Sequence, residues 1–294
     1  MSPQLVLLVN PAARGGRSLR LLEPVARRLR AGGAEVSVIA GRDAADALER
    51  ACAAVAERPD ALVAFGGDGL VHLAVQAVAG TDVPLGIIPA GTGNDIAAAL
   101  GLPRGDLMAA ARTVLRMRSR PVDAAAVSAG GVEELFAGVV CCGFDSRVNE
   151  RANRLTWPPG RARYLVAVAE ELRGFRPIPF RITLDGVTSE REAMLVAVAN
   201  TRSYGAGMRV CPQARPDDGL LDVMVLDAVG TGEFLRVFPR VYRGTHVTHP
   251  AVSITRVRSV LLEAPDVVAY ADGERVGPGP VACAVRPGVL RVLA

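Results

Sequence analysis

The sequence predicts a two-domain α/β protein, with a parallel-sheet domain first and a mainly antiparallel, β-sandwich-like domain second. Its length of 294 residues suits two modest domains or one large one. Strand-like apolar runs alternate with helix-spaced apolar positions before about residue 120, and turn-punctuated strands follow it. We therefore expect domains at 1–122 and 123–294, with the last strand a candidate to return to the first domain.

The first domain shows the spacing of consecutive strand–helix–strand units. Strands are expected at 4–10, 34–40, 60–67 and from 83, and helices at 18–30, 43–58 and 69–80. Such a chain forms a parallel sheet with helices on both faces, and it binds ligands at the carboxyl ends of the strands.

The second domain is expected to be rich in hairpins. A hairpin around Gly130 and Gly131 occupies 120–144, and a helical region near 145–173 is interrupted by the letters WPPG. The further segments that resemble strands are 180–201, 219–229, 258–265, 267–276 and 282–294.

The composition excludes several classes of protein. Half of the residues are apolar and 22% are charged, which is typical of globular proteins. The longest apolar runs, such as 193–199, are much shorter than the roughly 20 residues of a membrane-spanning helix. The N-terminus resembles a first strand and not a signal peptide, so we expect a cytoplasmic protein. Aromatic residues are only 4%, so we expect no nucleic-acid partner.

Two residue types limit the chemistry further. Every basic residue is Arg and the chain contains no Lys, which excludes a P-loop lysine. The five cysteines are odd in number and form no C-x-x-C motif, so we expect buried, reduced thiols and not a metal or redox site.

Three glycine-rich loops follow consecutive predicted strands, at 10–16, 66–72 and 89–97. Glycine lets the backbone approach an anion, and the N-terminus of the next helix offers N–H groups and positive partial charge. A nucleotide phosphate chain is the expected ligand. The dinucleotide fingerprint G-x-G-x-x-G is not matched after the first strand.

These loops carry the letters NP, GGDG and GTGND, and later segments carry GAGMRVCPQARPDDGLLDV (205–223) and ADGE (271–274). Together they resemble the catalytic domain shared by diacylglycerol kinases, bacterial lipid kinases and sphingosine kinases. The resemblance implies a Rossmann-like nucleotide-binding domain, similar to those of phosphofructokinases and NAD kinases, and a β-sandwich-like second domain. It also implies transfer of the γ-phosphoryl group of ATP to a lipid hydroxyl, with Mg²⁺.

The resemblance assigns roles to particular residues. Asp68 is expected at the metal and phosphate end of ATP, acting through Mg²⁺-bound waters. Glu274 is expected to accept the proton of the lipid hydroxyl, with Asp272 beside it in the catalytic site. A structural Mg²⁺ is expected on Asp218 and the carbonyls of Arg215 and Leu220. The residues expected to bind the nucleotide are Asn10, Pro11, Ala12, Ala13, Arg14, Gly66, Gly67, Asp68, Gly69, Leu70, Val71, His72, Thr92 and Asn94.

Several alternatives stay open at this point. Asp95 is either part of the site or a helix cap, and the Asp-Asp-Gly turn at 217–219 is either a metal site or a bare turn. His72 is interpreted as a helix-face residue more readily than as a base. Ala13-Arg14 replaces the Ser-Gly that is usual in the family, so an inactive nucleotide- or lipid-binding regulator is one alternative. An NAD kinase-like enzyme is another.

The expected partner is a lipid substrate at a membrane surface, which a peripheral enzyme without a spanning segment must contact. Trp157 among arginines in 151–165 is the candidate contact, with a buried Trp as the alternative reading. The acceptor lipid is not specified by the sequence: diacylglycerol, sphingoid bases, ceramide-like lipids, phosphatidylglycerol and polyketide-like alcohols all stay open. A homodimer also stays open.

Overall fold

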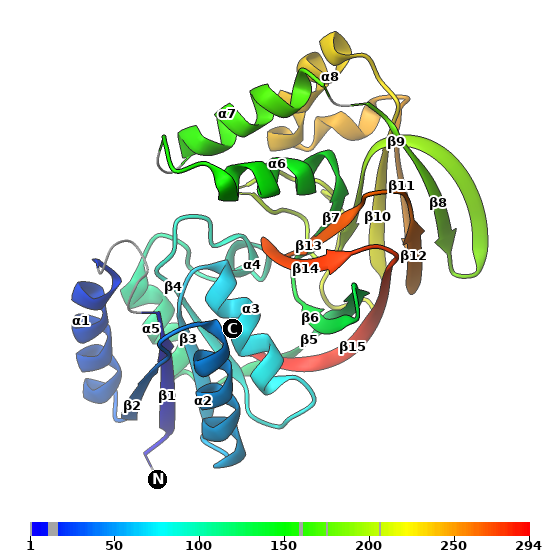
Figure 1. Cartoon of the computed structure of the whole chain (residues 1–294). Coiled ribbons are helices and arrows are strands. Elements are labelled where there is room, and N and C mark those ends of the chain that lie inside the picture. The colour runs from blue at the N-terminus through cyan, green and yellow to red at the C-terminus, as the bar shows by residue number, and fades with distance from the viewer. Residues whose placement is uncertain (1, 11–16, 159–160, 175, 206) are drawn as a thin grey trace. The chain divides into compact units, whose positions relative to one another are not determined.

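The structure of the chain is a computed structural model that describes residues 2–10, 17–158, 161–174, 176–205 and 207–294. The chain forms two compact units. Unit 1 comprises Met1–Ala124, Pro216–Gly219 and Arg286–Ala294, and unit 2 comprises Ala125–Arg215 and Leu220–Val285. Each unit is described by itself below, with the element labels of Figure 1.

Unit 1 is built on a parallel sheet in the order β2-β1-β3-β4. The end of β15 adds a parallel pairing of Val292 with Leu85 at the β4 edge. The elements are β1 (Gln4–Val9), α1 (Arg17–Ala31), β2 (Glu35–Ala40), α2 (Ala44–Ala56), β3 (Ala61–Gly66), α3 (Asp68–Val78), β4 (Leu85–Pro89), α4 (Asp95–Ala99), α5 (Leu107–Leu115), the start of β5 (Ser119–Ala129) and the end of β15 (Val281–Leu293).

The central strands of unit 1 are apolar on both faces because helices cover both. Every residue of β3 and β4 is buried, as expected for a parallel sheet between two helical layers. Leu5 and Leu7 of β1 share a cluster with Val25 of α1 and Val114 of α5. Helices α1 and α5 pack together, and so do α2 and α3 (Figure 1). The periodicity of the sequence therefore predicted this sheet correctly.

Unit 2 is mainly antiparallel, with strands in the order β14-β13-β7-β9-β8-β12-β15 and with β10 and β11 attached to β9. The elements are the end of β5, β6 (Val132–Phe136), β7 (Val139–Gly143), α6 (Phe144–Arg154), α7 (Arg161–Leu172), β8 (Ile178–Leu184), β9 (Val187–Ala199), β10 (Leu221–Asp227), α8 (Thr231–Val237), η2 (Phe238–Arg243), η3 (Thr245–Thr248), β11 (Val252–Val257), β12 (Ser259–Glu263), β13 (Val268–Ala271), β14 (Glu274–Pro278) and the start of β15.

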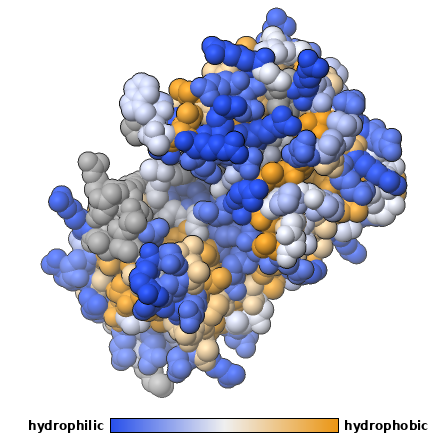
Figure 2. Space-filling view, in the orientation of Figure 1, coloured by the Kyte–Doolittle hydropathy of each residue, from blue (hydrophilic) through white to orange (hydrophobic). Residues whose placement is uncertain are grey.

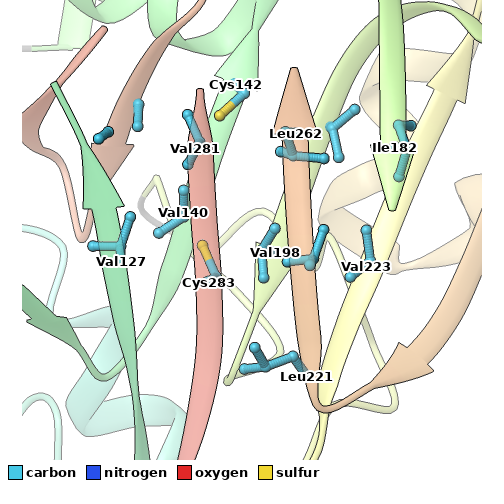
Figure 3. Packing of buried hydrophobic residues seen from close by; sticks show 14 of the residues in the cluster. Val127, Val140, Cys142, Ile182, Val198, Leu221, Val223, Leu262, Val281 and Cys283 are labelled. Atoms are coloured by element: carbon cyan, nitrogen blue, oxygen red, sulfur yellow. The ribbon is translucent and has the colours of Figure 1, made fainter. Parts of the chain in front are cut away.

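The strands of unit 2 present alternate residues to two separate cores. Val196 and Val198 of β9 lie in a core made of strands alone, where Val140, Val223 and Cys283 converge (Figure 3). Ala197 and Ala199 of β9 point into a second core, which α6, α7 and α8 cover. This two-residue alternation is what a sheet buried on both faces requires. The expected combination of a parallel α/β sheet and a sandwich-like β domain is confirmed.

Several elements of the fold are not predicted by the sequence pattern. They are the helices at 95–99 and 107–115, and the segment 231–248, where α8, η2 and η3 form. Asp106 caps α5 through its side chain, which accepts from the N–H groups of Met108 and Ala109. Cys52 is exposed, whereas the other four cysteines are buried as expected.

Asp123 holds together three stretches of unit 1 that are far apart in the sequence. Its carboxylate accepts from the N–H of Gly219 at 2.7 Å and the N–H of Gly288 at 2.7 Å. Its own N–H donates to the carbonyl of Pro216. Asp123 is only 4% exposed, so its carboxylate satisfies two N–H groups where water cannot easily replace it.

No helix within the described ranges is long and apolar enough to span a membrane.

We expect Asp123→Ala to lower the free energy of unfolding by roughly 2–4 kcal/mol, because two N–H groups lose their acceptor. Asp217→Ala is the matched control, since it removes an exposed ion pair to Arg120 at 3.6 Å and should cost less than about 1 kcal/mol. Urea denaturation of both variants tests this. Equal stability of the two would show that Asp123 does not hold the stretches together.

Candidate functional site

The GGDG motif forms a sharp strand-to-helix turn in unit 1. Strand β3 ends at Gly66, Gly67 is the N-cap residue of α3, and the helix begins at Asp68. The N–H groups of Leu70 and Val71 donate to the carbonyl of Gly67, which closes the first turn. A Cβ at Gly66 would lie 2.7 Å from a methyl carbon of Leu70, so a larger residue there would displace this side chain. The turn thus presents backbone at a helix N-terminus, which favours an anion.

The second glycine loop packs directly against the first. A Cβ at Gly91 would lie 2.3 Å from the Cα of Gly67, so the two backbones touch only because neither residue has a side chain. The N–H groups of Ala90 and Gly91 donate to the carbonyl of Gly66 at 2.9 and 3.1 Å. The loops after β3 and β4 therefore form a single glycine-lined surface, which the sequence predicted only as two separate loops.

Asn94 holds the second loop in shape. It adopts the left-handed conformation with φ 58°, and its side chain accepts from the N–H of Gly91. Its amide group donates to the carbonyls of Gly91 and Pro89. With Asn94 buried in this way, the exposed Thr92 is the residue of the loop whose side chain reaches solvent. We infer that Asn94 shapes the nucleotide loop, whereas Thr92 is placed to contact a ligand.

Asp68 joins the two loops by a hydrogen bond. Its Oδ1 accepts from the N–H of Ile96, in the first turn of α4, at 3.0 Å. A Cβ at Gly93 would lie 3.0 Å from Oδ2 of Asp68 and 3.5 Å from Oδ2 of Asp95, so both carboxylates face the same glycine. Asp68 thus acts as a cap on α4 and not on its own helix α3. Asp95, only 5% exposed, is the first residue of α4.

The residues expected to bind nucleotide differ in what they expose. The side chains of Leu70, Val71 and His72 are buried in unit 1, at 7%, 2% and 3% exposure. Any contact from them to a ligand would therefore come from the backbone. Asn10 is exposed just after β1. Pro11, Ala12, Ala13 and Arg14 lie outside the described residues.

The arrangement of the loops fits a nucleotide phosphate with Mg²⁺. The glycine surface is a cradle that a Cβ at Gly91 would fill, and Asp68 and Asp95 supply the oxygen donors that Mg²⁺ prefers. Mg²⁺ commonly binds one or two carboxylates and keeps several waters, so a larger set of protein ligands is not required. Among the described residues, no group of three or more His, Cys, Asp or Glu side chains could hold a metal.

The structural Mg²⁺ expected at 215–220 would be held by one carboxylate, that of Asp218, and by two backbone carbonyls. A cluster of three acidic side chains is therefore not expected there. Arg215 and Leu220 belong to unit 2, whereas Asp218 belongs to the short stretch Pro216–Gly219 of unit 1. The N–H of Gly219 in this stretch donates to the carboxylate of Asp123 at 2.7 Å. The structural Mg²⁺ stays a prediction.

In unit 2, Asp272 shapes the turn that precedes Glu274. Its carboxylate accepts from the N–H groups of Ala137, Gly138 and Val139 at 3.0, 2.8 and 3.1 Å. Its own N–H donates to the carbonyl of Val139, and its φ is 54°. Glu274 begins β14 with an exposed side chain. We infer that Asp272 is a positioning residue and that Glu274 is the carboxylate available to a substrate.

Unit 2 also contains an apolar pocket of about 560 Å³, open volume included, that the sequence analysis did not identify. Its walls come from β9, β10 and the segment 234–241, with Leu195, Met224 and Phe238 among the lining residues. The polar side chains at the pocket are Asp145, Tyr204, His246 and His249. Asp145 was not predicted from the sequence, although it lies two residues after Gly143, which ends the buried strand β7 and is the N-cap of α6.

Asp145 is the polar centre of this apolar pocket. The hydroxyl of Tyr204 donates to its carboxylate, and burial raises the pKa of Asp145 to about 7. His246 bonds to the carbonyl of Val210 through Nε2, and burial lowers its pKa. An apolar pocket with a few polar groups is typical of sites for small molecules. Figure 2 shows hydrophobic and hydrophilic surface interspersed on the unit that carries α6, α7 and α8.

A glycine-lined surface on a parallel sheet, together with a second unit that matches an NAD kinase beta sandwich-like domain, defines a class of two-unit α/β proteins. The Diacylglycerol kinase catalytic domain matches residues 4–127, and the YegS C-terminal NAD kinase beta sandwich-like domain matches residues 138–294. The chain belongs to the diacylglycerol kinase family.

Individual relatives agree with this membership. The chain is 43% identical to a diacylglycerol kinase of Mycobacterium tuberculosis over 293 residues, 99% of this chain and 94% of the relative. It is 31% identical to a diacylglycerol kinase of Bacillus subtilis, with 86% and 84% of the two chains covered. The crystal structure of a diacylglycerol kinase from Bacillus anthracis has the same fold, with a TM-score of 0.73, 23% identity, and coverage of 99% and 96%.

We expect Asp145→Asn to change how stability depends on pH. The folded-state pKa of Asp145 lies above its ordinary value of 3.8, so the folded chain keeps a proton that the unfolded chain releases. The contribution of this carboxyl is therefore full at low pH, and it is lost as the pH rises to about 7. Between pH 5 and 7 the stability of the wild type, relative to Asp145→Asn, should fall by about 2 kcal/mol.

Urea denaturation of both proteins at several pH values measures this difference in the free energy of unfolding. His246 is present in both proteins, so its contribution cancels. Asp82→Asn, at an exposed position of unit 1, is the control and should show no such trend. A flat difference for Asp145→Asn would contradict a raised pKa at this carboxyl.

Proposed function

We propose that this chain transfers the γ-phosphoryl group of ATP to the hydroxyl of a lipid of the diacylglycerol class, with Mg²⁺, at a membrane surface. The observation that carries this proposal is the apolar pocket of unit 2, whose polar side chains are Asp145, Tyr204, His246 and His249. The relatives at 43% and 31% identity that are named diacylglycerol kinase support it.

The chemistry of the pocket favours a lipid over a dinucleotide. Hydrocarbon chains gain about 0.8 kcal/mol for each CH₂ group removed from water, and this gain requires apolar walls such as Leu195, Met224 and Phe238. A nicotinamide or adenine ribose would need several hydrogen-bond partners there. The pocket supplies few, and Asp145 and Tyr204 already bond to each other. A lipid whose hydrocarbon chains lie along the apolar walls fits this pocket.

The glycine surface of unit 1 fits the other substrate. Backbone N–H groups at the start of α3 would hold the phosphate oxygens of ATP, and the exposed Thr92 would add a hydroxyl. Mg²⁺, when bound, neutralises charge on the phosphate oxygens. Asp68 would hold this ion and its waters while its Oδ1 stays bonded to Ile96, so the acid also fixes the position of the metal relative to the loops.

Glu274 supports the transfer step as the proton acceptor. The lipid oxygen forms a bond to the γ-phosphorus, the bond from that phosphorus to the bridging oxygen of ADP breaks, and the hydroxyl proton passes to a carboxylate. Glu274 is exposed, and its turn is held by the three bonds that Asp272 accepts. The products are ADP and a phosphorylated lipid.

Labelled γ-phosphate from ATP, incubated with the protein and a panel of lipids and resolved by chromatography, tests the proposal. Diacylglycerol should be labelled when Mg²⁺ is present and not when it is chelated. Asp68→Asn should lower the rate by about 10² or more, because it removes charge at the metal and phosphate site. An unlabelled panel would contradict a lipid kinase, and near-normal turnover of Asp68→Asn would contradict its assigned role.

Glu274→Gln should bind ATP nearly as well as the wild type but transfer phosphate about 10²- to 10⁴-fold more slowly, because the amide cannot accept the proton. Single-turnover transfer and nucleotide affinity, measured on the same preparation, separate these effects. Glu190→Gln, at an exposed position of β9, is the control and should leave both unchanged. Parallel losses of ATP affinity and transfer in Glu274→Gln would make Glu274 a structural residue.

A further inference from the structure

The segment 231–248 of unit 2, formed by α8, η2 and η3, has two chemically different sides. Its inner side lines the apolar pocket with Phe234, Val237, Phe238 and Val241. These residues are spaced by three and four, as one face of a helix requires. The segment therefore forms one wall of the pocket, and its other side is the outer surface of unit 2 at that wall.

The outer side combines exposed apolar side chains with arginines. Leu235 is 54% exposed, Tyr242 is 51% exposed and Val247 is 38% exposed, which is unusual for large apolar residues so close together in the sequence. Arg236, Arg240 and Arg243 alternate with them and are also exposed. Leu235 and Arg236 lie in α8, and Arg240, Tyr242 and Arg243 lie in the next element, η2.

The segment carries an excess of positive charge. It contains three arginines and a single carboxylate, Glu233, which is paired with His249 at 3.1 Å. Arginine beside exposed Leu and Tyr suits a surface that is anionic and has an apolar interior. Tyr is also common at the level of lipid head groups, where its ring is in the apolar layer and its hydroxyl is in water.

We propose that the outer side of 231–248 is the surface by which the chain docks on an anionic lipid bilayer. The inner side of the same segment lines the pocket, so docking puts the pocket wall at the bilayer. Leu235 and Tyr242 insert into the head-group layer, and Arg236, Arg240 and Arg243 bind lipid phosphates. The role of this docking surface rests on the proposed lipid kinase function. Binding to vesicles, however, can be measured without any phosphoryl transfer.

The surface differs from the one that the sequence indicated. Trp157, the candidate there, is 77% exposed in the structure, so the alternative of a buried Trp is wrong. Trp157 precedes residues 159–160, which lie outside the described part, and it lines no described pocket wall. The segment 231–248 instead carries both the exposed apolar residues and the pocket lining.

Vesicle sedimentation of the full chain without nucleotide tests the docking surface. The probes are phosphatidylcholine vesicles with and without phosphatidylglycerol. The wild type should bind the anionic vesicles, and this binding should weaken with salt. The variant Arg236→Gln/Arg240→Gln/Arg243→Gln should lose on the order of 100-fold in partition, about fivefold for each arginine. Leu235→Ser/Tyr242→Ser should lose about tenfold, through lost insertion.

Matched controls separate this surface from general charge and hydrophobicity. Arg58→Gln/Arg116→Gln/Arg286→Gln makes the same change in net charge at exposed positions of unit 1. Val132→Ser/Val187→Ser removes two exposed apolar side chains, 45% and 74% exposed, elsewhere in unit 2. Both controls should bind like the wild type, and thermal melting confirms that all variants are folded. Unchanged binding of the two test variants, equal losses in the controls, or loss only in Trp157→Ala would overturn the proposal.

A second measurement tests the docking surface separately from the proposed kinase function. The arginine variant should phosphorylate diacylglycerol in vesicles more slowly than the wild type, yet phosphorylate a water-dispersed short-chain diacylglycerol at the same rate. Failure of the wild type to label either lipid would contradict the kinase proposal while the sedimentation result still decides the docking surface. Equal losses on both lipids would overturn docking as the role of these arginines.

Discussion

The nucleotide half of the candidate site depends on a contact between two backbones. Gly67 and Gly91 are so close that a methyl group on Gly91 would lie 2.3 Å from the Cα of Gly67. Because the loops touch there, the carboxylate of Asp68 reaches the N–H of Ile96, and the two helices α3 and α4 start from one surface. Without this contact the loops after β3 and β4 would be two separate turns, each a weak anion site by itself.

The two faces of the strands in unit 2 are buried in different ways. One face is buried among strands alone, with Val198, Val223 and Cys283 in its core. The other face is covered by helices, and the packing there leaves an apolar pocket with Asp145 as a polar centre. Since adjacent residues of a strand point to opposite faces, the same short stretch of β9 contributes to both. The rigid core thus supports the pocket wall directly behind it.

Much of the fold could be predicted from the sequence because local signals were strong. The alternation of β3 and β4 with helices, and the glycine turns at their ends, follow from periodicity alone. The segment 231–248 could not be predicted in this way, because its apolar residues serve a pocket wall on one side and lie exposed on the other, which weakens the pattern. Asp145 was missed for a related reason: burial raises its pKa, and the pocket beside it is lined by residues distant in the sequence, such as Leu195 and Met224.

The roles within the predicted motifs were also beyond local reasoning. Asn94 and Asp272 both belong to recognisable motifs, and both side chains bond to backbone groups. The partners of Asn94 lie within its own loop, whereas those of Asp272 are more than 130 residues away in the sequence. A motif indicates that a residue matters, while the partner of its side chain shows whether it touches a ligand or shapes the loop that does.

Unit 1 is assembled from separate stretches of the chain, and this affects how it folds during synthesis. Its residues come from three stretches, and Asp123 bonds to the two that are synthesised later, at Gly219 and Gly288. When only the first 124 residues have been synthesised, all of the sheet β2-β1-β3-β4 has been made but neither of these partners has. Unit 1 therefore cannot be completed, and its edge beside β4 stays unpaired, until the residues of unit 2 have been synthesised.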